Sequence, residues 1–114
     1  MGAKPMGRLT YTSDGYMHAL MMPAGRAHYP SGDVFGGNDE EMLAASDHFV
    51  AYCGPFEVRG DTIYHSPELS FFPNWVGSEM ARMAKLEGNR LSLTSHEQMR
   101  GGRKSTAVIV WERD

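Results

Sequence analysis

The sequence predicts a mainly β protein, an antiparallel barrel of about seven short strands with one helix. Three observations support this fold class. The 114 residues include 13 glycines and 6 prolines, which implies many turns and short elements. Several segments alternate between apolar and polar residues, as half-buried strands do, and a single segment shows helical spacing. The length suits one hydrophobic core, so we expect residues 1–114 to form a single domain.

The first two predicted strands form a hairpin. Residues 8–12 alternate in character, and the alternation resumes over residues 16–22. Asp14-Gly15 lies between them, and an Asp-Gly pair is a strong hairpin signal because glycine supplies the positive φ of the turn. Residues 23–37 are rich in Gly, Pro, Ser and Asp without periodicity, which predicts a long loop. We expect this loop, together with the helix that follows, to cover one mouth of the barrel.

One helix is predicted from Asn38 to about Ala51. Asn38 is a suitable N-cap, and Glu41 is its capping-box partner three residues later. Met42, Leu43 and further apolar residues up to Cys53 fall at helical spacing, which predicts one apolar face. Gly54-Pro55 is expected to end the helix.

The remaining chain is predicted to be mostly strand. The turn Arg59-Gly60-Asp61 joins two strands into a second hairpin, and an aromatic connection over residues 67–77 leads to the next strand. Residues 96–104, which include Gly101-Gly102, are predicted to be a polar loop. The expected strands are residues 56–58, 62–66, 79–86, 91–95 and 106–113.

Composition excludes several classes of function. Apolar residues make up 41% and charged residues 22%, as in ordinary soluble proteins. The net charge of −3 argues against nucleic-acid binding, and no apolar run approaches the roughly 18 residues of a membrane span. Residues 1–7 lack the apolar core of a signal peptide, and Cys53 is the single cysteine. These features predict a protein of the reducing cytoplasm.

Motifs along nearly the whole chain resemble those of the lipocalin-like domain family, whose members are mostly uncharacterised bacterial and fungal proteins. The Pro-Asn-Trp-x-Gly and Trp-x-Arg pieces are the most specific. The resemblance implies a small calycin-type antiparallel barrel with an internal cavity. It rests on Gly7-Arg8-Leu9-Thr10-Tyr11-Thr12, Asp14-Gly15-Tyr16-Met17, Asn38-Asp39-Glu40-Glu41, Ala51-Tyr52-Cys53-Gly54, Thr62-Ile63-Tyr64-His65, Phe72-Pro73-Asn74-Trp75-Val76-Gly77, Arg82, Arg90-Leu91-Ser92-Leu93 and Val110-Trp111-Glu112-Arg113.

The sequence departs from the family pattern at its start, because members usually carry an additional strand with a Gly-x-Trp motif before the Gly-x-Leu segment. A sheet without that strand has an open edge, and an open edge invites pairing with another chain. A smaller barrel, a second protomer over the gap, or a start further upstream would each account for this. A homodimer is our expectation.

Arg82 and His65 are the main candidates for chemistry. Arg82 shares its strand face with Met80 and Leu86, which predicts that it points into the barrel. A buried arginine either pairs with a structural partner or binds an anionic or carbonyl-bearing ligand. His65 shares a face with Ile63, so it is also expected inside, either as a general acid or base or as a core residue that hydrogen-bonds a tyrosine.

The other candidates are expected to form the walls of a ligand cavity. Tyr52 offers a phenolic group and completes a candidate catalytic set with His65 and Arg82. The five histidines are scattered without the spacing of metal ligands, so no metal site and no cofactor are predicted. The predicted ligand-binding residues are Tyr11, Met17, Tyr52, His65, Trp75, Met80, Arg82 and Trp111.

These residues favour a barrel that binds a small apolar or amphipathic molecule in a cavity lined by methionines and aromatic side chains, with one polar anchor. The alternative is a cofactor-independent isomerase, cyclase or lyase, in which His65 moves a proton and Arg82 with a tyrosine stabilises an oxyanion. A third possibility is an interaction protein that pairs through an open sheet edge and has no functional cavity.

Overall fold

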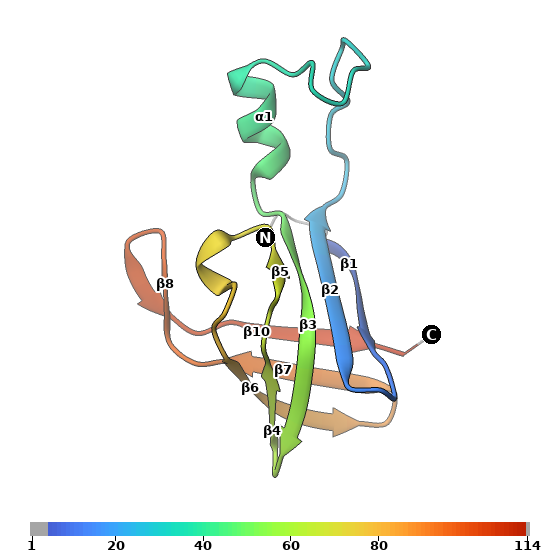
Figure 1. Cartoon of the computed structure of the whole chain (residues 1–114), viewed down its shortest axis with the longest axis vertical. Coiled ribbons are helices and arrows are strands. Elements are labelled where there is room, and N and C mark those ends of the chain that lie inside the picture. The colour runs from blue at the N-terminus through green and yellow to red at the C-terminus, as the bar shows by residue number, and fades with distance from the viewer. Residues whose placement is uncertain (1–4, 114) are drawn as a thin grey trace.

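The computed structural model describes residues 5–113 as a β-barrel from which one helix and its neighbouring loop project (Figure 1). The predicted fold class, mainly β with one α-helix, is confirmed. The elements are β1 (Pro5–Tyr11), β2 (Tyr16–Pro23), α1 (Asp39–Ser46), β3 (Val50–Arg59), β4 (Thr62–His65), β5 (Leu69–Ser70), the 3-10 helix η1 (Pro73–Trp75), β6 (Met80–Glu87), β7 (Arg90–Ser95), β8 (Gln98–Arg100), β9 (Arg103–Ser105) and β10 (Val108–Glu112).

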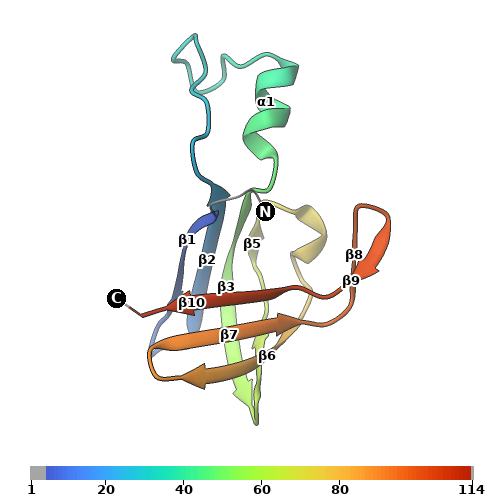
Figure 2. The same ribbon diagram turned by 180° about the vertical axis from the view of Figure 1, so that it is seen from behind.

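Seven strands form the barrel wall in the order β1-β2-β3-β4-β6-β7-β10, and every neighbouring pair is antiparallel. The short β5 pairs with β3 beside this path. β6, β7 and β10 cross behind β1, β2 and β3 in Figure 1 and in front of them in Figure 2. Over residues 5–113, no strand pairing joins β1 to β10, so the barrel is nearly closed and has two edges.

The core lies between these two groups of strands. Met17 and Ala19 on β2 are buried, whereas His18 and Leu20 between and after them are exposed. This alternation is the pattern that the sequence predicted for a half-buried strand. Ile63, Met80 and Leu93 complete the buried apolar set from β4, β6 and β7.

The hairpin turns form where the sequence predicted them. The amide of Thr12 donates to the carbonyl of Tyr16 at 2.8 Å, and Gly15 has φ +94°. In the second hairpin Gly60 has φ +63°. Glycine adopts these left-handed conformations without the steric cost that a Cβ would add.

Helix α1 begins as predicted, but the prediction that it continues to about Ala51 is wrong. The Asn38 side chain accepts from the Glu41 amide at 2.8 Å, and the Glu41 carboxylate accepts from the Asn38 amide at 2.9 Å. The helix ends at Ser46, and His48 has φ +54°, which breaks the helical path. From Val50 the chain pairs with β2, and these inter-strand hydrogen bonds outweigh the apolar helical spacing of the segment.

Gly54-Pro55, which was expected to end the helix, instead lies inside β3 where that strand changes partners. Residues up to Pro55 pair with β2, and residues from Phe56 pair with β4. A Cβ on Gly54 would lie 2.2 Å from the carbonyl oxygen of Ser66. The glycine therefore permits the backbone after β4 to approach β3 closely.

Two connections contain more structure than the sequence indicated. The segment 96–104, predicted to be a polar loop, is mostly the hairpin of β8 and β9, and the prediction of a loop is wrong there. Its turn uses Gly101 and Gly102, both with positive φ. The aromatic connection 67–77 contains β5 and η1.

Among the described residues, no helix has the length and apolar character of a membrane span.

Candidate functional site

A chain of hydrogen bonds centred on His65 lies in the interior of the barrel. His65 is the last residue of β4 and is fully buried. Its Nε2 atom lies 2.6 Å from the hydroxyl of Tyr11 on β1, and its Nδ1 atom lies 2.9 Å from the hydroxyl of Tyr52 on β3. Both ring nitrogens therefore have partners, and one buried imidazole joins two tyrosines from different strands.

Burial and a nearby positive charge hold this imidazole in its neutral form. Burial, reinforced by the charge of Arg82, lowers the pKa of His65 to about 4. Burial also raises the pKa of Tyr11 and of Tyr52, and the Arg82 charge opposes this rise only in part. At neutral pH all three side chains are uncharged, so they interact through hydrogen bonds between neutral groups and not as ion pairs.

A small cavity of about 360 Å³ adjoins Tyr52. Its walls come from β1, β2, β3, η1, β6, β7 and β10 and are mostly apolar, with Trp75 and Trp111 as the largest side chains. The rings of Tyr52 and Trp75 meet edge to face, with centroids 5.4 Å apart. Polar groups on the walls are supplied by Tyr52, Arg82 and Ser95. A largely apolar cavity with a few polar groups is the usual form of a small-molecule site.

Arg82 reaches this cavity from β6, where it is half-buried and pairs in register with Ile63 and Ser95. Its guanidinium donates to the carbonyl oxygen of Ala81 at 3.0 Å and contacts the sulfur of Met80 at 3.7 Å. A guanidinium has five N–H donors, so it can keep these contacts and also donate to a ligand. The cavity wall therefore carries a cationic hydrogen-bond donor among apolar side chains.

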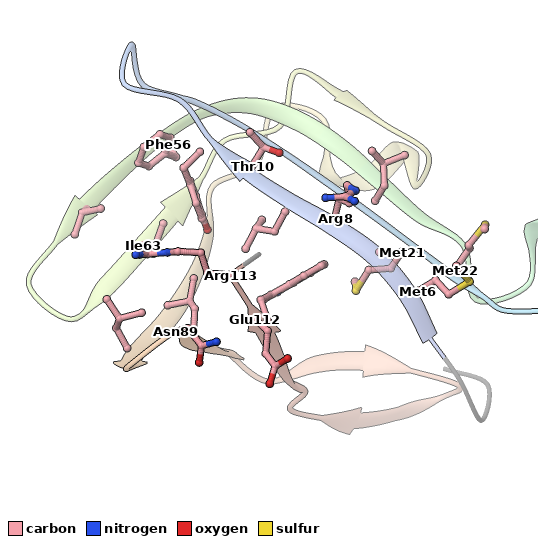
Figure 3. A pocket seen from close by; sticks show the side chains of 18 of the residues that line it. Met6, Arg8, Thr10, Met21, Met22, Phe56, Ile63, Asn89, Glu112 and Arg113 are labelled. Carbon is pink, nitrogen blue, oxygen red and sulfur yellow. The ribbon is translucent and has the colours of Figure 1, made fainter.

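A larger cavity of about 1140 Å³ opens along β1 toward the ends of β7 and β10 (Figure 3). Met6, Met21 and Met22 line one part of it, and Tyr11 and Phe56 line another. Asn89, Glu112 and Arg113 lie across the cavity from Arg8 on β1 (Figure 3). Because β1 and β10 do not pair, this cavity occupies the gap between the two edges of the sheet.

A family model for the lipocalin-like domain matches residues 1–114. The chain belongs to this family. Over 106 residues this lipocalin-like domain is also 29% identical to the 4'-hydroxy-3'-methoxypropiophenone carrier protein of Aspergillus oryzae. The similarity covers 85% of the present chain and 96% of the carrier protein. No solved structure matches the chain.

Most of the residues predicted to bind a ligand in this lipocalin-like domain do line a cavity. Tyr52, Trp75 and Arg82 line the small cavity, Tyr11 lines the large one, and Trp111 lines both. His65 lies on the wall of neither, because the rings of Tyr11 and Tyr52 lie on either side of it.

Met17 and Met80 were also predicted to contact the ligand, and they line neither cavity. Both are buried in the packed part of the barrel, and for Met80 this agrees with the inward face that the alternation of β6 predicted. Alternation within a strand distinguishes inside from outside, and it does not distinguish a packed interior from a hollow one.

The predicted cover over one mouth of the barrel is absent from the described structure. Helix α1 buries none of its residues, and Leu43 is 71% exposed. Phe35 in the preceding loop is 93% exposed. Both cavities are lined without any residue from 24 to 48, and Figures 1 and 2 show this segment extending away from the barrel.

Ser95 is a cavity residue that the sequence analysis missed. It is the last residue of β7 and is buried, and its hydroxyl accepts from the amide of Ala107 at 2.9 Å. The alternation of Leu93 and Ser95 was the available signal, since both side chains face inward.

Among residues 5–113, no group of three His, Cys, Asp or Glu side chains is arranged to hold a metal ion.

Proposed function

We propose that this lipocalin-like domain binds and carries a small, largely apolar molecule that has a carbonyl or phenolic oxygen. The observation that carries the proposal is Arg82 on the wall of the small cavity, beside Tyr52 and two tryptophans. The volume of about 360 Å³ lies within the usual range of roughly 300–1000 Å³ for small-molecule sites. The guanidinium and the hydroxyl supply donors, and the indole rings supply flat apolar surface.

The relative described above supports an aromatic ketone as the class of ligand. That protein is named as a carrier of 4'-hydroxy-3'-methoxypropiophenone, a phenol that bears a ketone. A molecule of this chemistry would place its ring against Trp75 or Trp111 and one oxygen near Arg82. Family membership supports the binding barrel, and the polar groups of the cavity support the choice of ligand class.

The test is a titration of the protein with 4'-hydroxy-3'-methoxypropiophenone, followed by tryptophan fluorescence and calorimetry. We expect Arg82→Met to weaken binding about tenfold or more, because a hydrogen bond from a charged group contributes about 1.5–3 kcal/mol. Arg59→Met is the matched control, since Arg59 is exposed and pairs with Glu57 and Glu79 outside both cavities. Equal affinities of the two variants would contradict the proposal. Circular dichroism checks that both variants are folded.

The second candidate function is a cofactor-independent isomerase, cyclase or lyase. The observation that favours it is the hydrogen bond between Tyr52 and His65, because Tyr52 lies on the same cavity as Arg82. Tyr52 would relay a proton between the substrate and His65 while Arg82 stabilised an oxyanion. Incubating the same ketone with the protein in deuterated water distinguishes the two functions. Protein-dependent exchange of the protons next to the carbonyl supports catalysis, and its absence supports a carrier.

A homodimer and a cytoplasmic location are further parts of the proposal. The unpaired edges of β1 and β10 offer backbone groups to a second copy of the chain. The single cysteine, Cys53, suits a reducing compartment. Native mass spectrometry tests the dimer, and a strictly monomeric mass at micromolar concentration would exclude it.

A further inference from the structure

Tyr11 and Tyr52 line different cavities, and His65 hydrogen-bonds to both of them. Tyr11 lines the large cavity and Tyr52 lines the small one, whereas His65 lines neither. The two hydroxyls bond to opposite nitrogens of the same imidazole, at 2.6 Å to Nε2 and 2.9 Å to Nδ1. The hydrogen bonds Tyr11–His65–Tyr52 therefore link a residue that lines the large cavity to one that lines the small cavity.

A neutral imidazole has one N–H donor and one acceptor nitrogen, so its two tyrosine partners cannot have the same role. When Nδ1 carries the proton, it donates to the oxygen of Tyr52, and Nε2 accepts the proton of Tyr11. The hydroxyl proton of Tyr52 is then available to an acceptor in the small cavity. The oxygen of Tyr11 is at the same time available to accept from a donor in the large cavity. With the proton on Nε2, these roles are exchanged.

We propose that the hydrogen bonds Tyr11–His65–Tyr52 couple ligand binding in the two cavities. A hydrogen-bond acceptor bound at Tyr52 then makes Tyr11 prefer a hydrogen-bond donor in the large cavity. The proposal rests on the proposed function, since it requires a carbonyl oxygen in the small cavity. It extends that function to a second binding site, which takes a molecule with a hydroxyl or amine group. Linkage makes the coupling reciprocal, because each ligand changes the affinity of the other by the same factor.

Exchange between the two forms of His65 conserves protons and charge. In the change from the Nε2–H form to the Nδ1–H form, water in the small cavity gives one proton to the oxygen of Tyr52, and the hydroxyl proton of Tyr11 leaves to water in the large cavity. Between them, the hydroxyl proton of Tyr52 moves to Nδ1 and the Nε2 proton moves to the oxygen of Tyr11. Because burial keeps the pKa of His65 low, at about 4, the doubly protonated imidazole that would end this coupling is scarce at pH 7.

The test uses propiophenone, a ketone without a donor, as the probe for the small cavity and phenol as the donor probe for the large one. Nuclear magnetic resonance locates each probe through the indole N–H of Trp75, which lines only the small cavity, and the methyl group of Met22, which lines only the large one. The ¹⁵N resonances of His65, assigned with His65→Gln, report which ring nitrogen carries the proton.

We expect saturating propiophenone to move the proton of His65 to Nδ1 and to raise the affinity of phenol for the large cavity about fivefold. Tyr11→Phe should abolish the increase in phenol affinity while propiophenone still binds. Tyr64→Phe is the matched control, because Tyr64 lies on neither cavity and stacks with Arg59 instead. It should keep the full increase.

Three outcomes would overturn the coupling. Propiophenone binding at Trp75 without a change in the His65 resonances would overturn it and leave the proposed carrier function intact. A fivefold increase that persists in Tyr11→Phe would show that another route connects the cavities. Absence of propiophenone from the small cavity would overturn the coupling and the proposed carrier function together.

Discussion

The hydroxyl of Tyr11 lies 2.6 Å from Nε2 of His65, although 54 positions separate the two residues in the sequence. The contact requires that β1 and β4 lie on opposite sides of one interior, which follows from the curvature of the sheet through β2 and β3. Tyr52 occupies the other nitrogen at 2.9 Å. This arrangement gives His65 both of the hydrogen bonds that a buried neutral imidazole needs.

Lowering the pH should destabilise the protein through His65. Its pKa is about 4 in the folded state and 6.5 in the ordinary unfolded chain, so the unfolded state binds more protons between these values. The contribution of the neutral imidazole is complete above pH 6.5 and is lost as the pH falls toward 4. At about 1.4 kcal/mol per pH unit, the loss is about 3 kcal/mol. Urea unfolding at several pH values measures it.

The control for this prediction is His65→Gln, because other groups also titrate in the same range. The variant starts less stable, and its free energy of unfolding should fall by about 3 kcal/mol less than that of the wild type from pH 7 to pH 4. Parallel pH profiles of the two proteins would show that His65 does not contribute as expected.

The proposed carrier function predicts that replacing Trp75 by Phe weakens binding of 4'-hydroxy-3'-methoxypropiophenone about two- to tenfold. The indole lines the small cavity and meets Tyr52 edge to face, and an aromatic contact of this kind contributes about 0.5–1.5 kcal/mol. Calorimetry measures the affinity. In the companion variant Trp111→Phe, the fluorescence of Trp75 should still change on binding. A ligand that leaves this fluorescence unchanged does not occupy the small cavity.

Removing the cap of α1 with Asn38→Ala should loosen the helix and leave the barrel intact. The Asn38 side chain holds the Glu41 amide at 2.8 Å, and loss of such a cap costs about 1 kcal/mol. Helix α1 buries no residue, so the lost free energy should destabilise the helix alone and not the barrel. Hydrogen exchange of the helix amides should accelerate about fivefold while the urea midpoint stays unchanged. A lower midpoint would mean that the helix unfolds together with the barrel.

Gly54→Ala should destabilise the protein by about 3 kcal/mol. The new methyl group would lie 2.2 Å from the carbonyl oxygen of Ser66 and 2.9 Å from the amide of Glu68, and backbone atoms cannot move aside as a flexible side chain can. Gly60→Ala is the comparison, because a Cβ there meets no atom within 4 Å and incurs only the positive φ of +63°. Urea unfolding measures the stability of both variants, and Gly60→Ala should lower the free energy of unfolding by about 1 kcal/mol. Equal losses would contradict the prediction.

Local signals were enough to predict the hairpins that turn at Gly15 and Gly60, the start of the helix and the inward faces of several strands, although they missed the hairpin of β8 and β9. Asp14-Gly15 and the turn at Gly60 depend on the φ that glycine allows, and the cap at Asn38 depends on a partner three residues away. Each cause lies within a few residues of its effect, so the chain encodes it locally. The prediction of where the helix ends was wrong because Val50 and its neighbours form their hydrogen bonds with β2, which lies about thirty positions earlier in the chain.

The sequence by itself determined the barrel class, the turns and the interior placement of Arg82 and His65, because alternation along a strand separates inside from outside. Only the tertiary structure decided what those interior positions become. Met17 lies in packed core, Arg82 on a cavity wall, and His65 between two tyrosines. Cavities and buried hydrogen-bond partners arise where distant strands meet, and that meeting depends on register, twist and side-chain volume summed over the whole barrel.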